Sequence, residues 1–441
     1  MTGAPIPEVM SPKLMKVMER AKRDPKVSFN ALAHLIDEDA LRRAFGRIRK
    51  NAAGGVDGVT KEEYGLLLDV RLHDLHERLR TKGYRHQPIR RVTIPKERGK
   101  TRPIGISTIE DKVVQGALTE LLEVVYEPAF LDCSHGFRRG RRAHDALRVL
   151  HRELGREGSW VLEADIQSFF DSIDRKMLME MLRERIADKS LLRLIGKCLH
   201  VGVLDGEEYS EPDEGTVQGS VLSPMLGNVY LHHVLDLWFE HEVQPRLRGK
   251  AHLVRYADDL VIAFEREDDA KRVMAVLPRR FERFGLKLHP DKTRLVPFVR
   301  PPDDQQSGKG GPTFDFLGFT VYWRRGRRGG WGAAFKTRKA RLQRAVKAAR
   351  EWCRAYMHLP VKEQHAALCR RINGHFNYFG VNWNQRSMKV LRRCIERVWF
   401  RALRRRSQRG RRLTWDRFGS WLRVFPLPSV RVRVQLWQAP P

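Results

Sequence analysis

Three aspartates at the ends of apolar runs are the residues whose type and spacing could do chemistry. Asp165 closes the run VLEADI, and Asp258 and Asp259 interrupt the run LVRYADDLVIAF. Ionised carboxylates beside a hydrophobic layer are costly unless a positive charge compensates them. A pair of divalent cations about 4 Å apart would do so and could steady the attacking and leaving oxygens of a phosphoryl transfer. Asp-Asp alone is common in surface turns, so the flanking apolar runs are what favour a catalytic cluster.

The elements that must position these aspartates are short strands. The apolar runs predict a strand at 160–166 and a hairpin of 253–256 and 260–264. The hairpin turn would project Asp258 and Asp259 from one tip, and Asp165 could come alongside on a neighbouring strand. A further strand at 314–319 and a helix at 226–240 complete the pattern of an α+β fold.

The chain after Phe335 changes character. Apolar residues recur there at helical spacing and predict three amphipathic helices, at 342–356, 368–376 and 391–402, packed as a small bundle. Arginines, lysines and tryptophans are interleaved along them. Basic side chains that neutralise phosphates, beside aromatic rings that can stack on unpaired bases, favour binding of folded RNA. A solvated basic face over a tryptophan core is the competing interpretation.

Composition points to the same partner. The 441 residues include 84 Lys and Arg against 53 Asp and Glu, a formal charge of +31 that a bound polyanion would relieve. Basic residues interrupt every hydrophobic stretch before the roughly 20 residues of a membrane span, and MTGAPIPEVM lacks the pattern of a signal peptide. We therefore expect a cytoplasmic protein with no membrane partner. The five cysteines contain no C-x-x-C pair and suggest neither disulfides nor zinc.

Several motifs in order resemble the reverse transcriptases encoded by bacterial group II introns, of the compact type without an endonuclease domain. These are YADD (256–259), EADIQSFFDSID (163–174), GTVQGSVLSPMLGNVYL (215–231), RVTIPKERGKTRPIGIST (91–108), KLHPDKT (287–293) and FDFLGF (314–319). The resemblance implies a right-hand polymerase: an N-terminal extension and helical fingers at 1–85, fingers and a palm with a small antiparallel sheet at 86–323, and an all-helical thumb or maturase domain at 324–441.

The resemblance also implies roles for individual residues. Asp165, Asp258 and Asp259, with the carbonyl of Ile166, would hold two Mg²⁺ ions. The residues that would surround the incoming nucleotide and its pyrophosphate are Lys96, Arg102, Phe170, Gln218 and Lys292. The primer grip would be Phe316, Leu317, Gly318 and Phe319. Two departures affect the nucleotide pocket: many family members have Pro at Val217, and Lys-Gly at Gln167-Ser168.

The implied function is an RNA-directed DNA polymerase that binds a structured intron RNA, assists its splicing and copies RNA into DNA for retrotransposition. Its partners would be intron RNA as template and primer, a DNA target and deoxynucleoside triphosphates, in a bacterial ribonucleoprotein or at the nucleoid. Two alternatives stay open: an intron-independent reverse transcriptase of the same lineage, associated with defence or CRISPR, and an RNA-binding splicing cofactor without polymerase activity. The sequence does not indicate an oligomeric state.

Overall fold

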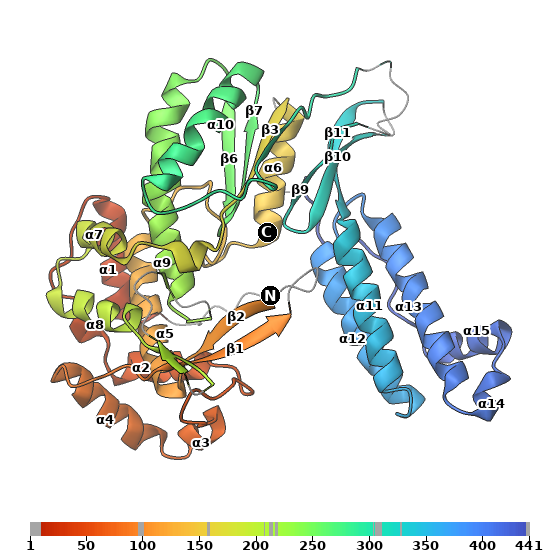
Figure 1. Cartoon of the computed structure of the whole chain (residues 1–441), viewed down its shortest axis with the longest axis horizontal. Coiled ribbons are helices and arrows are strands. Elements are labelled where there is room, and N and C mark those ends of the chain that lie inside the picture. The colour runs from red at the N-terminus through yellow and green to blue at the C-terminus, as the bar shows by residue number, and fades with distance from the viewer. Residues whose placement is uncertain are drawn as a thin grey trace.

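The computed structural model describes residues 10–95, 101–156, 159–206, 208–210, 215–216, 219–302, 304, 311–326 and 329–437. It is an α+β structure, as the sequence predicts. N-terminal helices lie beside a β-hairpin, a central sheet lies between helices, and a column of C-terminal helices stands to one side (Figure 1). Within the described residues, no helix is long and apolar enough to cross a membrane.

The N-terminal part is built around one buried helix. The long α5 (Ile109–Tyr126) is buried along most of its length, and α1 (Pro12–Arg23) and α2 (Glu38–Arg47) pack against it. Two shorter helices, α3 (Lys61–Gly65) and α4 (Leu68–Arg80), lie outside. Side-chain caps fix where these helices start, as at Thr60, where Thr60 and Glu63 form a capping box.

The hairpin beside these helices consists of β1 (Ile89–Pro95) and β2 (Thr101–Ile106). A second, short hairpin of β4 (Val203–Asp205) and β5 (Glu208–Ser210) extends it, so that the strand order is β2-β1-β4-β5.

The central sheet carries the aspartates. Its strands are β3 (Trp160–Asp165), β6 (Ala251–Tyr256), β7 (Asp259–Phe264) and β8 (Arg294–Val296), all antiparallel in the order β6-β7-β3-β8. Both faces are covered. Leu260 and Ile262 of β7 pack into a core with α10 (Glu267–Glu282), whereas Val261 and Ala263 pack against α6 (Ala143–Arg156). The predicted strands are confirmed. Their apolar runs are continuous because both faces of the sheet are buried.

Three helices connect the hairpins to the sheet. They are α7 (Arg175–Arg185), α8 (Lys189–Leu199) and α9 (Ser223–Leu231). The helix predicted at 226–240 is present, but it leaves α-helical geometry: α9 continues into π-helical turns at His232–Asp236 and Phe239–Val243.

The C-terminal part begins with strands. A three-stranded sheet is formed by β9 (Phe314–Phe316), β10 (Phe319–Arg325) and β11 (Trp331–Thr337). The sequence-based boundary at residue 324 therefore cuts this sheet, and the helices begin at Lys339. The reason is that Trp331, Ala333 and Phe335 alternate on one face of β11 and pack into the same core as α6.

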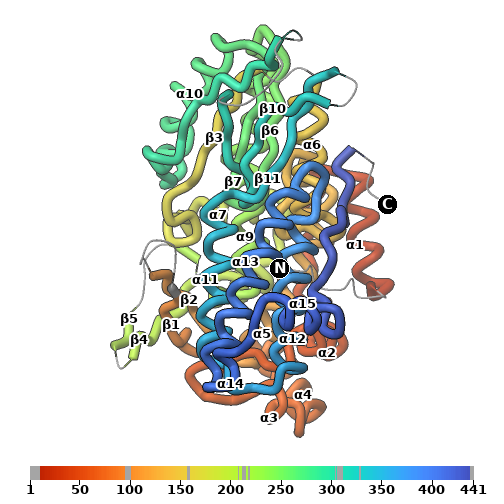
Figure 2. Tube along the Cα trace, turned by 90° about the vertical axis from the view of Figure 1, so that its right-hand side faces the viewer, coloured from red at the N-terminus to blue at the C-terminus, as the bar shows by residue number. Residues whose placement is uncertain are grey.

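The helices that follow form the expected bundle. They are α11 (Lys339–Ala355), α12 (Val361–Phe379), α13 (Gln385–Arg405), α14 (Gln408–Arg411) and α15 (Trp415–Val424). Their core is separate and contains Leu368, Ile372, Leu391 and Trp399. Figure 2, in which these helices face the viewer, shows them below β10 and β11.

Candidate active site

The structure brings Asp165, Asp258 and Asp259 to one end of the central sheet, where β3 ends and β7 begins. In the antiparallel pairing of β3 with β7, Asp165 lies directly opposite Asp259. Residues 257 and 258 form the tight turn between β6 and β7, with Ala257 at a φ of 58°. Opposite residues in antiparallel strands have Cα atoms about 4.5–5.5 Å apart. Three carboxylates from distant stretches of sequence therefore share one small volume.

Their negative charges are only partly compensated. Loss of hydration, together with repulsion from Asp165, raises the pKa of Asp258. Asp259 is exposed at the start of β7. Loss of hydration where the surrounding protein replaces water, together with repulsion from Asp258 and Asp165, nevertheless raises its pKa to about 7. Even without loss of hydration, three neighbouring carboxylates would give this direction. A cluster that resists full ionisation is one that gains from a bound cation.

Lys292 lies beside this cluster. Its Nζ is 2.5 Å from Oδ2 of Asp165, and about half of its side chain is exposed. The loop that carries it is fixed beside β3, because the His289 amide donates to the carbonyl of Asp165 at 2.8 Å. Lys292 is thus the cation that partly neutralises Asp165.

The donor set fits Mg²⁺. Carboxylates and a carbonyl are hard oxygen ligands, which Mg²⁺ prefers. The bridge that joins Ile166 to Leu288 uses the amide of Gln167 and the carbonyl of Asp165, and these hydrogen bonds do not involve the carbonyl of Ile166. Over the described ranges no three His, Cys, Asp or Glu residues are grouped closely enough to hold a metal by themselves. Mg²⁺ is commonly bound by one or two carboxylates plus substrate phosphates, so a preformed cage is not required.

The nucleotide side of the site is described in part. Arg102 lies on β2 with an exposed side chain, and its charge lowers the pKa of Asp258, which places it on the side of the carboxylates. Lys96 and Gln218 lie outside the residues that the structure describes. The loop next to Gln218 does meet β2. At Gly219, whose φ is 112°, an added Cβ would lie 2.5 Å from the carbonyl oxygen of Gly105, so glycine is required there.

Phe170 packs closely against α9 and the backbone near Thr216. An added Cβ on Gly227 of α9 would lie 2.9 Å from the ring of Phe169 and 3.2 Å from that of Phe170, and the Thr216 amide donates to the Phe170 carbonyl at 2.6 Å. Phe169 is buried and Phe170 is half-buried. Ser168, two residues before Phe170, is left-handed at a φ of 43°, a backbone conformation that glycine adopts more readily than other residues.

The FLGF segment divides between core and surface. Phe316 and Phe319 are buried, while Leu317 and Gly318 form the turn between β9 and β10 with φ angles of 50° and 80°. The Tyr378 hydroxyl, on α12, donates to the Leu317 carbonyl at 2.9 Å. Only the two turn residues are therefore placed to touch a strand at the surface.

A buried charge network behind the YADD turn is absent from our sequence-based predictions. Arg255 is fully buried and bonds to both carboxylate oxygens of Asp236, at 2.8 and 2.5 Å. It also donates to Asn228, to the Ser134 hydroxyl and, at 3.2 Å, to the Ala257 carbonyl of the turn. The only sequence signal was an arginine inside an apolar strand. Arg255 connects the turn that presents Asp258 to three other segments of the chain.

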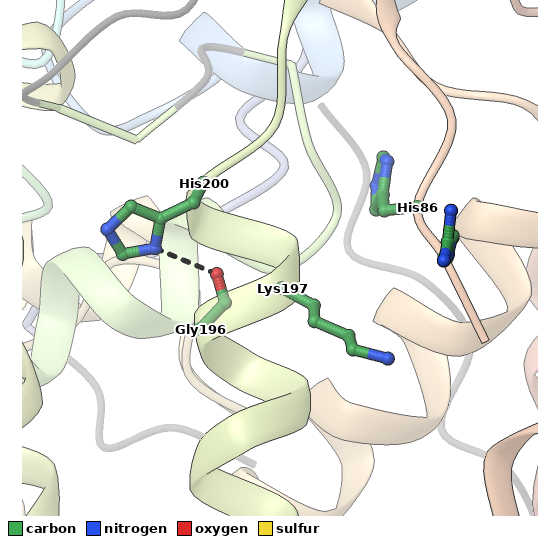
Figure 3. A pocket seen from close by; sticks show the side chains of 5 residues that line it. His86, Gly196, Lys197 and His200 are labelled. Atoms are coloured by element: carbon green, nitrogen blue, oxygen red, sulfur yellow. Dashed lines mark hydrogen bonds between the residues drawn. The ribbon is translucent and has the colours of Figure 1, made fainter. Parts of the chain in front are cut away.

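An open hollow elsewhere is basic but contains none of the three aspartates. It has a volume of about 360 Å³ and is lined by Arg85, His86, Gly196, Lys197 and His200 (Figure 3). The Lys197 ammonium already contacts the carbonyls of Lys82 and Tyr84, and His200 bonds to the Gly196 carbonyl at 3.0 Å. This hollow is therefore separate from the carboxylate cluster.

The sequence of this chain is similar to those of known proteins. Residues 94–321, just over half of the chain, match the family "Reverse transcriptase (RNA-dependent DNA polymerase)". The chain is 29% identical over 306 residues to the group II intron-encoded protein LtrA of Lactococcus lactis subsp. cremoris, covering 66% of this chain and 51% of LtrA. It is 34% identical over 257 residues to protein YkfC of Escherichia coli K12, covering 56% of this chain and 66% of YkfC. The chain thus spans about half the length of LtrA.

Proposed function

The chain belongs to the reverse transcriptase (RNA-dependent DNA polymerase) family, and from this premise we propose that it is an RNA-directed DNA polymerase. It would extend a primer 3′-hydroxyl with deoxynucleoside triphosphates on an RNA template. The observation that carries the proposal is the meeting of Asp165, Asp258 and Asp259 at one end of the central sheet, inside the segment that matches the family. Strands β1–β2 and the N-terminal helices would be the fingers, the central sheet the palm and α11–α15 the thumb.

The residues would divide the work as follows. Asp165 and Asp258, supported by Asp259 and the carbonyl of Ile166, would hold two Mg²⁺ ions. When bound, these ions lower the pKa of the attacking hydroxyl and neutralise charge on the phosphate. Lys96 and Arg102 would bind the triphosphate as a point charge and a planar fork. Lys292 would move its ammonium from Asp165 towards the leaving pyrophosphate once the site is filled.

Two further residues would shape the nucleotide pocket. Phe170, held by Gly227, would crowd the 2′ position of the sugar and favour deoxynucleotides. Gln218 would lie beside the incoming base. Leu317 and Gly318 would contact the primer, with Phe316 and Phe319 anchoring their turn.

Activity should depend on Asp258 in a way that RNA binding does not. Asp258→Ala removes a ligand from the cluster, and we expect it to abolish primer extension with Mg²⁺ while the affinity for RNA stays nearly unchanged. Asp268→Ala is the matched control, because Asp268 is a half-exposed aspartate on α10 paired with Arg266. Normal extension by the Asp258→Ala protein would show that the site is misassigned.

We further propose that the RNA partner is a structured intron, whose splicing the thumb assists before the RNA is copied into DNA. The similarity to an intron-encoded protein and the basic helices α11 and α13 support this proposal. The similarity to YkfC, whose name mentions no intron, keeps an intron-independent enzyme of the same lineage as the second candidate. Crosslinking of RNA to the protein in its host, followed by sequencing, separates the two. A ribozyme-like RNA from the flanking locus supports the first, and its absence among the crosslinked RNAs contradicts it.

A further inference from the structure

Arg341, in the first turn of α11, lies against the turn between β9 and β10 without belonging to it. A Cβ added to Gly318 would lie 3.6 Å from Nε and 3.7 Å from Cγ of Arg341. The side chain is exposed, and among the described residues we find no hydrogen bond or ion pair of its guanidinium. One turn earlier, Arg338 does have a partner, Asp315, at 2.9 Å. Arg341 therefore offers an unused planar cation beside the turn.

The start of α11 is fixed to the turn. The amide of Arg338, at the start of α11, donates to the Gly318 carbonyl at 3.0 Å. The Tyr378 hydroxyl holds the neighbouring Leu317 carbonyl, and its ring stacks on Phe319. Helix and turn are thus joined by backbone and side-chain bonds, so the backbone of Arg341 keeps its place beside the turn.

The turn beside Arg341 lies next to the strands that carry the carboxylates. Strand β9, which leads into this turn, contacts both β3 and β7. Tyr256, Leu317 and Tyr378 pack against one hydrophobic core at the junction of the central sheet and the C-terminal helices. Arg102 lies on the β1–β2 hairpin, which Figure 1 shows apart from α11. A triphosphate bound at Arg102 would leave Arg341 free for another anion.

We propose that Arg341 binds a backbone phosphate of the primer strand close to its 3′ end. This inference rests on the proposed polymerase function and names a residue outside the FLGF motif as the charge of the primer site. A strand whose 3′-hydroxyl reaches Asp165 and Asp258 must bring its own phosphates past three carboxylates, which repel them. A guanidinium fork beside the turn offsets that repulsion and sets the direction of the strand through two parallel hydrogen bonds.

A phosphate scan tests this contact directly. Primers carrying one neutral methylphosphonate at successive linkages from the 3′ end are annealed to an RNA template, and their dissociation constants are measured. For the wild-type protein, neutralising the contacted linkage should weaken binding about tenfold, the size of a charge-assisted hydrogen bond. Arg341→Ala should weaken binding of the normal primer by a similar factor. For this variant, neutralising the contacted linkage should have no further effect, whereas the other linkages should behave as in the wild type. Arg341→Lys should recover part of both effects.

The control is Lys271→Ala, which removes one exposed positive charge from α10, where Lys271 pairs with Glu267. Its scan should match that of the wild type. The inference is overturned if the Arg341→Ala scan equals the wild-type scan at every primer linkage. It is also overturned if the same scan of the template strand shows that the lost sensitivity lies there. The scan measures binding without catalysis. A wild-type protein that binds as expected but extends no primer would refute the polymerase and leave the phosphate contact standing.

Discussion

At the scale of single residues, the carboxylate cluster trades stability for cation binding. Asp165, Asp258 and Asp259 come together in a fold that offers Lys292 and Arg102 as compensating charges. Loss of hydration, together with repulsion within the cluster, raises the pKa of Asp258 and brings that of Asp259 to about 7, against an ordinary 3.8. In the metal-free protein, ionised Asp259 therefore opposes folding.

The stability of the metal-free protein should show this repulsion. The folded state binds more protons than the unfolded state between pH 3.8 and about 7 at Asp259, so its contribution to stability falls as pH rises through that window. We expect Asp259→Asn to unfold at a higher temperature than wild type in EDTA at pH 8. The difference should shrink steadily as the pH is lowered towards 4, and Mg²⁺ should reverse its sign at pH 8.

Thermal unfolding at several pH values, followed by circular dichroism, measures this difference. Asp268→Asn, on the first turn of α10, controls for the loss of a carboxylate elsewhere. A gap between wild type and Asp259→Asn that stays constant from pH 8 to pH 4 would show that the raised pKa is not the cause.

At the scale of elements, the turn that presents Asp258 depends on charges placed behind it. Arg255 is buried on β6 and Asp236 on the π-helical turn after α9, and their ion pair is closed to water on both sides. A buried pair contributes little net stability, but removing one partner leaves the other charge stranded. The hydrogen bond from Arg255 to the Ala257 carbonyl links that pair to the geometry of the site.

Arg255→Ala should therefore destabilise the protein by about 3–5 kcal/mol in urea unfolding, because Asp236 is left buried and unpaired. The double variant Arg255→Met, Asp236→Leu should recover much of that loss but not the rate of primer extension, since the Ala257 carbonyl keeps no donor. A loss below about 1 kcal/mol for Arg255→Ala, the level of an exposed pair, would contradict the structural role given to the network.

Parts of this arrangement could be predicted from sequence, and the limits have physical causes. The strands expected at 160–166, 253–256 and 260–264 were predictable to within two residues, since apolar runs around a two-residue turn are local features. The register that sets Asp165 opposite Asp259 was not, because it depends on pairing between distant segments. The FLGF residues could not be divided into core and surface until the β-strand alternation around Phe316 and Phe319 was known.

Arg255 illustrates a different limit. An arginine between Val254 and Tyr256 reads as an ordinary edge position unless its partner is known. That partner, Asp236, lies on another element, and the π-helical turn that aims it towards the sheet has no clear sequence signature. The strand β11 was missed for a simpler reason: its glycine and alanines give a weak strand pattern next to a strongly helical segment.

At the scale of the whole molecule, the chain carries a formal charge of +31 and brings three carboxylates together at one end of its central sheet. Much of the basic surface belongs to the helices of the thumb, where many arginines are exposed, as along α13. Such a surface binds a polyanion mainly by releasing condensed counterions. Binding of RNA should then be governed by ionic strength more than by sequence.

The affinity for a structured RNA should fall about a thousandfold or more between about 50 and 200 mM salt if six or more phosphates are contacted. Filter binding at a series of salt concentrations gives the slope of log affinity against log salt. A peptide nucleic acid of the same base sequence, which has no phosphates, should show almost no slope. An equally shallow slope for the RNA would count against a phosphate-binding surface.

The wide helical turns after α9 have a consequence for how this protein can vary. From His232 to Asp236 the backbone bonds skip one residue more than in an α-helix, as the Leu237 amide reaching back to the His232 carbonyl shows. Each residue turns a helix by about 100°, so deleting one amino acid here would swing Asp236 away from Arg255. The length of this segment is therefore itself under constraint.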